Sequence, residues 1–276
     1  MTNALTYTIP VSHVAAFRGR KMIVRAPDPL EIMANITDED FATISFVRLL
    51  SLNGEIDGLM AWGHGIPVDL VVSDPCRDLP LLYRYAPLLG VHPIRVSVPL
   101  LPGFANVVKL AVSLSFAVKV EGGQPEESLS DELQRIARLY LHQSTVCEPI
   151  EFFHSLFLAF LQQDPVSLWA IQEEDPSLGR YITDQGEETM PGRLAGAPVN
   201  PGFSSFLHEL QDGLTADKWE CAGCEFVMHC LGYFKWPRRE YRCDTVKALM
   251  KTLQSAAEEL RADIASFHSP EGGGRT

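Results

Sequence analysis

The chain has 276 residues, of which 46% are hydrophobic and 21% charged, as expected for a folded protein with one large domain or one domain plus a small module. A net charge of −12 argues against a nucleic-acid partner, because such partners usually require a basic surface. The sequence has no apolar stretch long enough for a transmembrane helix and no signal-peptide pattern, so we expect a cytoplasmic protein without a membrane partner.

Short apolar runs alternate with helical patterns in the first half of the chain. The candidate strands are Lys21–Arg25, Val68–Val72, Ile94–Val98 and Phe116–Val120. The helices expected between them cover residues 37–52, Leu79–Leu89 and Ala105–Leu114, and Thr37 and Asp40 have the spacing of a capping box. This alternation predicts an α/β fold with a parallel sheet, either a partial (β/α) barrel or an open doubly wound sheet.

Two stronger helices follow, and after them the composition changes. Ser130 is expected to cap the first helix and Pro149 to open the second. Residues 165–202 are rich in proline and glycine, with a possible hairpin around Tyr181–Thr183, and are predicted to form a linker. A last amphipathic helix has apolar positions from Val246 to Ile264.

These patterns predict four segments. Residues 1–164 form the barrel-like domain and residues 165–202 the linker. Residues 203–268 form a small cysteine-rich module with a C-terminal helix, and residues 269–276 are expected to be a disordered tail.

The strongest signal for chemistry is a group of four cysteines among the six in the chain. They are spaced C-x2-C-x5-C-x12-C and are Cys221, Cys224, Cys230 and Cys243. In a reducing compartment such a group indicates metal ligands rather than disulfides, and soft thiolates favour zinc or an iron–sulfur cluster. The two outlying cysteines, Cys76 and Cys147, are expected to be packing residues.

The cysteine-rich module resembles the SPASM domain that follows the barrel in many radical S-adenosylmethionine enzymes, especially peptide maturases. The pattern of that family is C-x2-C-x5-C-x3-C and, after a gap, a last cysteine. Cys221, Cys224 and Cys230 match the first three cysteines, and Cys243 matches the last; Phe234 stands at the x3 position. The resemblance implies that these four cysteines hold one auxiliary [4Fe–4S] cluster and that the other auxiliary cluster of the family is lost.

The order of the chain, βα units before a cysteine-rich module, also resembles those enzymes. Their C-x3-C-x2-C motif is absent, because the matching region 25–38 contains no cysteine. The resemblance therefore implies a degenerate member of the family without a radical-generating cluster. Its expected role is that of an accessory iron–sulfur protein in peptide (RiPP-type) maturation, which binds a precursor peptide or a radical enzyme partner or relays an electron.

The residues also permit a different interpretation of the same cysteines. Four thiolates can hold a structural zinc ion, which stabilises a fold without taking part in chemistry. The chain would then be a (β/α) enzyme of unknown reaction, with Asp74 and Glu121, which follow predicted strands, as candidate active-site groups. A third possibility is an interaction scaffold, so the sequence leaves open whether the protein is an enzyme.

The segment Leu231–Arg242 (LGYFKWPRREYR) mixes cations with aromatic residues between the third and fourth clustered cysteines. Its cations would offset the negative charge of a thiolate-bound cluster, or the segment would dock an acidic partner. The alternative is a solvated loop whose aromatic side chains fold inward.

Overall fold

The computed structural model describes residues 5–63, 65–197, 205–216 and 219–268. The strands are β1 (Thr6–Pro10), β2 (Met22–Ala26), β3 (Ile44–Leu49), β4 (Val68–Val71), β5 (Ile94–Pro99), β6 (Ala117–Glu121), β7 (Ile150–Glu151), β8 (Gly179–Ile182) and β9 (Glu188–Thr189). The α-helices are α1 (Val14–Phe17), α2 (Pro29–Asn35), α3 (Pro75–Asp78), α4 (Phe104–Ser113), α5 (Ser130–His142), α6 (Phe153–Gln162), α7 (Leu168–Ile171), α8 (Phe206–Ala216), α9 (Val227–Cys230) and α10 (Asp244–His268). The 3-10 helices are η1 (Val11–His13), η2 (Asp38–Asp40), η3 (Asp57–Ala61), η4 (Leu79–Gly90), η5 (Glu127–Leu129), η6 (Gly192–Leu194), η7 (Glu220–Gly223) and η8 (Tyr233–Lys235).

Nine strands of the described residues form one sheet in the order β7-β6-β5-β4-β3-β2-β1-β8-β9. Neighbours from β1 to β7 are parallel and follow the order of the chain, and β8 is also parallel to β1; only β9 is antiparallel. A doubly wound sheet would reverse its strand order after the first strands, and β1 to β7 do not. The fold is therefore α/β with a mostly parallel sheet, in an order compatible with a partial (β/α) barrel.

The two faces of the sheet differ in chemistry. On one face every described strand from β1 to β7 contributes buried aliphatic residues, which pack with α4 into the core; examples are Val24, Val47, Leu70, Val96, Val118 and Ile150. On the other face, Arg25, Arg48, Asp69 and Arg95 are direct neighbours in the register of β2 to β5. Side chains alternate between the faces of a strand, so each of these strands is apolar on one side and charged on the other.

Several elements agree with the sequence-based predictions. The strands expected near residues 68–72, 94–98 and 116–120 are β4, β5 and β6, and the helix expected at residues 105–114 is α4. The hairpin around Tyr181 is present as β8 and β9, with Tyr181 opposite Thr189. The predicted capping box of Thr37 and Asp40 is also confirmed, although it caps the short η2.

The helix predicted over residues 37–52 is wrong, because its second half is the strand β3. Val47 and Leu49 face the core, whereas Phe46 and Arg48 lie on the charged face, so the true period is two. Apolar residues at 41, 44 and 47 imitate helical spacing by coincidence. The strand β1 was not predicted from the sequence.

Three further expectations need correction. Ser130 is the first residue of α5 and makes no capping hydrogen bond, and Pro149 does not open a helix, since β7 follows it and α6 begins only at Phe153. The segment 165–202, predicted as a linker, carries α7 and the strands β8 and β9, and β8 pairs with β1. The tail 269–276 lies outside the described residues.

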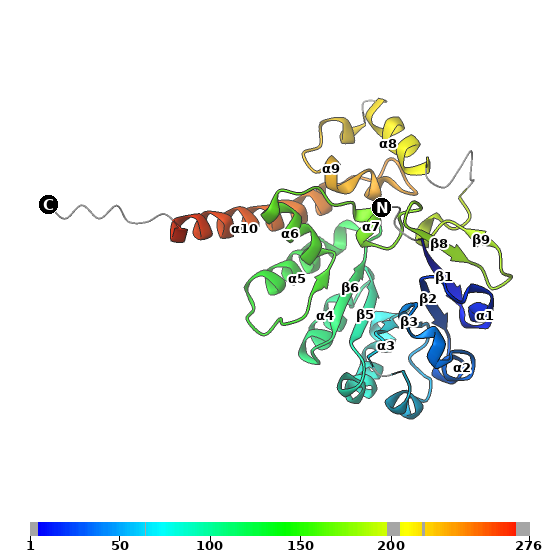
Figure 1. The fold of residues 1–276 in the computed structure, drawn as a ribbon. Coiled ribbons are helices and arrows are strands. Elements are labelled where there is room, and N and C mark those ends of the chain that lie inside the picture. Colours follow the sequence, from blue (N-terminus) through cyan, green and yellow to red (C-terminus); the bar gives the residue numbers. More distant parts are fainter. Residues whose placement is uncertain (1–4, 64, 198–204, 217–218, 269–276) are drawn as a thin grey trace.

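The cysteine-rich segment lies at one end of the sheet, with α8 and α9 near the top of the view in Figure 1. The predicted C-terminal helix is confirmed as α10, which packs against α5 and α6 and then extends past them. No helix in the described residues is both long and apolar enough to cross a membrane.

Candidate functional site

The four clustered cysteines line one small cavity. Cys221 lies in η7, and Cys224 is the first residue after that helix. Cys230 is the last residue of α9, and Cys243 directly precedes α10. Cys221 and Cys243 are buried and the other two are half-buried. Cys76 and Cys147 are exposed and lie outside this cavity. The fold therefore gathers the four cysteines that the spacing singled out and leaves the other two apart.

The wall of this cysteine cavity is apolar on one side and charged on the other. Phe226, Phe234 and Met250 contribute apolar surface. On the charged side Glu220 joins two lysines, with its carboxylate oxygens 2.7 Å from Lys235 Nζ and 2.6 Å from Lys247 Nζ. Burial alone would raise the pKa of Glu220, but the hydrogen bonds from these lysines lower it to about 2.

Burial favours the neutral thiol at Cys221, Cys230 and Cys243. Burial raises the pKa of Cys230 to about 11 and that of Cys243 to about 12, and repulsion between neighbouring cysteines acts in the same direction. Within the described part of the chain, no three His, Cys, Asp or Glu side chains are arranged to hold a metal ion as they stand. Binding a metal there would require the thiols to lose protons and turn toward a common centre.

The basic and aromatic segment between Cys230 and Cys243 is divided by its burial. Tyr233, Phe234 and Lys235 are buried, whereas Arg238 and Arg242 are exposed. The Lys235 ammonium also donates a hydrogen bond to the carbonyl of Tyr241. One cation of the segment therefore lies beside the cysteines, and its arginines face solvent.

This segment also joins the module to the sheet. The Tyr233 hydroxyl donates to the carbonyl of Gly122, just after β6, at 2.6 Å. The side-chain amide of Gln124 donates to the carbonyls of Phe234 at 2.9 Å and Arg238 at 2.7 Å. A Cβ on Gly122 would lie 2.8 Å from a carbon of the Tyr233 ring, so the close contact requires glycine at this position.

A network of charges covers the polar face of the sheet. Asp69 binds Arg48 Nε at 2.8 Å and Arg95 Nη2 at 2.9 Å, and it accepts a hydrogen bond from Ser97 at 2.7 Å. Burial alone would raise the pKa of Asp69, but attraction to Arg95 and Arg48 holds it well below its ordinary value. The carboxylate therefore remains charged although it is almost fully buried.

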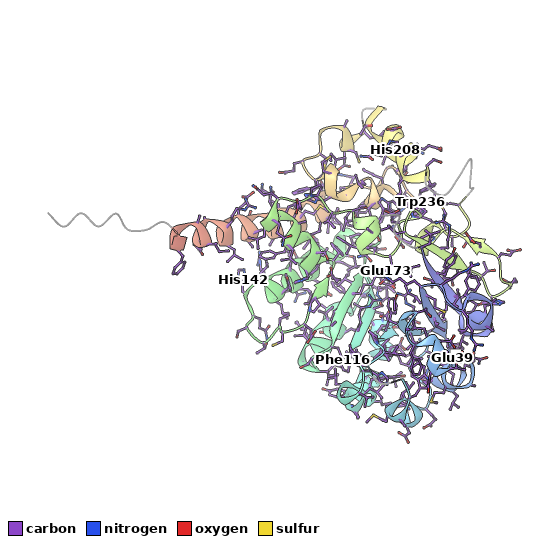
Figure 2. All side chains as sticks on the ribbon, viewed as in Figure 1. Glu39, Phe116, His142, Glu173, His208 and Trp236 are labelled. Atoms are coloured by element: carbon purple, nitrogen blue, oxygen red, sulfur yellow. The ribbon has the colours of Figure 1, made fainter. Side chains whose placement is uncertain are left out.

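Glu173 completes this network from a distant part of the chain. It lies near the centre of the molecule, in the turn after α7 (Figure 2). Its carboxylate is 2.8 Å from Arg48 Nη2, 2.8 Å from Arg95 Nη1 and 3.1 Å from Lys119 Nζ. Three strands thus each supply a cation to one carboxylate.

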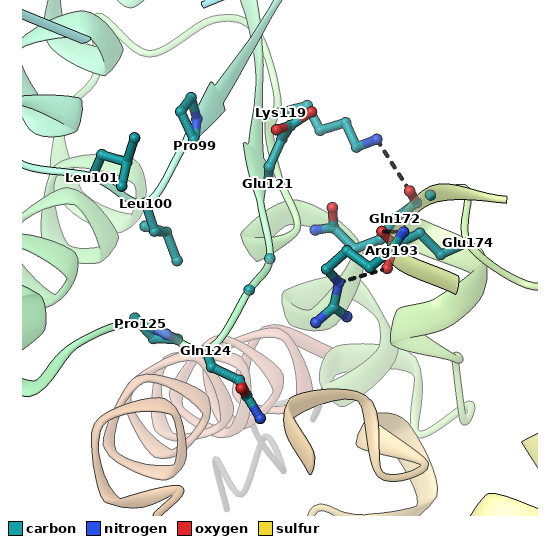
Figure 3. A pocket seen from close by; sticks show the side chains of 13 residues that line it. Pro99, Leu100, Leu101, Lys119, Glu121, Gln124, Pro125, Gln172, Glu174 and Arg193 are labelled. Atoms are coloured by element: carbon teal, nitrogen blue, oxygen red, sulfur yellow. Dashed lines mark hydrogen bonds and ion pairs between the residues drawn. The ribbon is translucent and has the colours of Figure 1, made fainter. Parts of the chain in front are cut away.

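A cavity with a volume of about 490 Å³ lies at the carboxyl ends of β5 and β6 (Figure 3). We call it the strand-end cavity. Pro99, Leu100 and Leu101 form one wall, while Gln172, Glu174 and Arg193 form the wall across from it. Lys119 and Glu121 of β6 lie between these walls, at the edge where parallel sheets commonly bind ligands.

The two strand-end carboxylates proposed from the sequence have different surroundings. Asp74 accepts hydrogen bonds from the backbone amides of Cys76 and Arg77 and caps α3, which is a structural role. Glu121 lines the strand-end cavity, and burial raises its pKa although Lys119 and Arg48 oppose the effect. Of these two, Glu121 is the candidate for binding or chemistry.

Sequence reasoning missed the charge network, although a signal for it was present. Arg48, Asp69, Arg95 and Lys119 each interrupt an otherwise apolar strand, and such positions must lie on a common face when strands are in register. Glu173 gave no such signal, because its position beside these residues depends on the fold of residues 165–202.

Comparisons with known proteins found no matching family model, no matching curated protein and no matching solved structure.

Proposed function

We propose that the chain is an accessory iron–sulfur protein of peptide maturation, resembling a SPASM-domain maturase without a radical-generating cluster. It would bind a precursor peptide or a radical enzyme, or relay an electron between them. The observation that carries the proposal is the convergence of Cys221, Cys224, Cys230 and Cys243 on one cavity beside a mostly parallel sheet.

The donor set fits a metal centre. Four thiols share one cavity, and soft sulfur ligands select zinc or iron–sulfur clusters. Lys235 and Lys247 lie on the same cavity with Glu220 bound between them, so this group would set one net positive charge against four thiolates. Bound there, a [4Fe–4S] cluster would supply one-electron transfer, and Phe226 and Phe234 would limit the access of water to it.

The sheet supports the comparison with a degenerate barrel. The strands β1 to β7 follow one another in order, and β8 lies parallel beside β1, as the last strand of a closed barrel does. β7 is the last strand at one end of the sheet, whereas β8 pairs with β1 and β9. Within the described residues the sheet is therefore not closed between β7 and β8. The stretches after β1 and after β2, from 11 to 21 and from 27 to 43, contain no cysteine.

The polar face adds a second support for a role without radical generation. In a catalytic barrel, charged groups on the inner face are available to a cofactor or substrate. Here Arg48, Arg95 and Lys119 are already paired with Asp69 and Glu173. The central part of this face is therefore satisfied by the chain itself.

Metal content tests the proposal directly. The protein would be purified without oxygen, and iron, sulfide and zinc would be measured per chain together with an absorption spectrum. About four irons with matching sulfide and a broad visible band support an iron–sulfur protein. Cys224→Ser should abolish the band, whereas Cys147→Ser, outside the cavity, should keep it. A colourless protein without iron refutes the proposal.

One observation favours the alternative, a (β/α) enzyme with a structural zinc site. The cysteine cavity has a volume of only about 20 Å³, close to the space of one water molecule, so a single ion would need less rearrangement of the thiols than a four-iron cluster. The strand-end cavity with Glu121 would then be the active site. One zinc per chain and no iron would favour this alternative.

A further inference from the structure

Four charged side chains line the strand-end cavity, and in the described part of the chain the protein itself pairs all of them except Glu121. Lys119 Nζ is 3.1 Å from Glu173 and donates to the carbonyl of Gln172 at 3.1 Å. Arg193 Nε is 3.0 Å from Glu174, and its Nη1 donates to the carbonyl of Trp236 at 2.9 Å. The two cations of the cavity are therefore held by the protein.

Glu121 differs from its neighbours. Among the described residues its carboxylate accepts no hydrogen bond and forms no ion pair at contact distance. The side chain is half-buried, and its backbone belongs to β6, so its place in the cavity is fixed. A carboxylate removed from water without a partner is costly, and a ligand that donates hydrogen bonds or carries a positive charge would relieve that cost.

The remaining surface of the cavity defines the rest of such a ligand. Pro99, Leu100 and Leu101 form an apolar wall, and Leu101 remains 46% exposed despite its size. Gly122 and Gly123 line the cavity next to Glu121 without side chains that would fill the space. A short aliphatic chain fits against this wall while its charged end reaches Glu121.

We propose that the strand-end cavity binds an alkylammonium group, with the Glu121 carboxylate as counterion and the Pro99–Leu101 wall in contact with the methylene chain. The ammonium group has two possible sources, a free alkylamine or the side chain of a lysine in a peptide. This inference rests on the residues that line the cavity and does not require a particular metal at the cysteines.

Calorimetric titration of the purified full chain tests the inference with probes that differ only in their end group. Pentylamine should bind, whereas pentanoate and pentanol, with the same chain length, should bind at least tenfold more weakly. Nα-acetyl-lysine methylamide tested against 1,5-diaminopentane distinguishes the sources. Tighter binding of the blocked lysine indicates a peptide side chain, tighter binding of the diamine indicates a free amine, and either result supports the site.

Three variants test whether the charge of Glu121, and not another carboxylate nearby, binds the amine. Glu121→Gln keeps the size and removes the charge, so pentylamine affinity should fall at least tenfold; Glu121→Asp keeps the charge and should retain measurable binding. Glu126→Gln removes an exposed carboxylate that does not line this cavity and should bind as the wild type does. Circular dichroism and metal content would be measured on every variant, so that a folding or metal defect is recognised.

Three results would overturn the inference. They are the absence of pentylamine binding to the wild type, equal binding by folded Glu121→Gln, and tighter binding of pentanoate than of pentylamine. The last would show that Lys119 or Arg193 dominates the cavity. None of these results depends on the identity of the metal, so failure here is distinct from failure of the proposed function.

Discussion

Glu173 offers the sharpest test of how the sheet is held together. It joins cations from β3, β5 and β6 through contacts of 2.8 to 3.1 Å, although it lies far from them in the sequence. Glu173→Gln preserves the size of the side chain and removes its charge. Lys119, which is 5% exposed, would then keep only neutral acceptors at contact distance, the carbonyl of Gln172 and the amide oxygen of the new side chain. We expect this substitution to destabilise the whole sheet.

The size of this loss of unfolding free energy can be estimated from the pKa of Glu173. Burial alone would raise this pKa, but Lys119, Arg95 and Arg48 lower it from 4.5 to about 2. Since one pKa unit corresponds to about 1.4 kcal/mol, the folded protein favours the charged carboxylate by about 3 kcal/mol. The Gln variant should therefore lose about 3 kcal/mol of unfolding free energy at pH 7, an order-of-magnitude figure.

The pH dependence has a defined sign. A carboxyl group whose pKa is lower in the folded state stabilises the protein above its unfolded pKa, and this contribution is lost as the pH falls toward the folded pKa. The stabilisation contributed by the Glu173 carboxylate is therefore lost between about pH 5 and about pH 2. At pH 3 the difference between wild type and variant should have fallen to about half its value at pH 7.

Urea denaturation followed by circular dichroism at pH 7, 5 and 3 measures these differences. Glu188→Gln is the matched control, because it removes one carboxylate of an ion pair on the same sheet, 3.1 Å from Arg180, but Glu188 is 46% exposed. Its cost should stay below about 1 kcal/mol. A Glu173→Gln loss no larger than that of the control, or a loss independent of pH, would refute the role assigned to Glu173.

Other predictions concern the cysteine module and its contact with the sheet. Cys243→Ser should lose bound metal and destabilise the module, whereas Cys147→Ser should keep both, as measured by metal analysis and thermal melting. Gly122→Ala should lower the unfolding free energy measured in urea by about 1–3 kcal/mol, because the added Cβ would lie 2.8 Å from the Tyr233 ring. Tyr233→Phe removes one hydrogen bond and should lower it by about 1 kcal/mol. If iron is bound, Lys235→Met should make the cluster harder to reduce, since a nearby cation stabilises the more negative state; an unchanged midpoint in a redox titration would contradict this.

The sequence predicted the elements that have clear local patterns. Val68–Val71, Ile94–Pro99 and Ala117–Glu121 are short β-branched runs with turn residues at their ends, and each is a strand of the sheet. β3 was mistaken for a helix because Phe41, Ile44 and Val47 happen to recur at helical spacing across its start. β4, β5 and β6 also carry a charged residue on one face and were predicted correctly, so the polar face was not the cause of the error.

Long-range pairings were beyond sequence reasoning for a different reason. β8 has four residues and follows a segment rich in proline, so nothing local indicates that it lies beside β1. The same holds for Glu173, whose three partners are distant along the chain. Spacing did single out the four cysteines, because metal ligands must be close in space and short segments keep them so.

The cysteine module and the strand-end cavity share structural elements, so their functions should be linked. Gly122 and Gln124, which line that cavity, are held by Tyr233 and by the carbonyl of Phe234, and both aromatic residues lie between Cys230 and Cys243. Any rearrangement of the cysteines around a metal would move the segment between them. Because this segment contacts the wall of the cavity through hydrogen bonds of 2.6 and 2.9 Å, metal binding is expected to shape the cavity in which Glu121 lies.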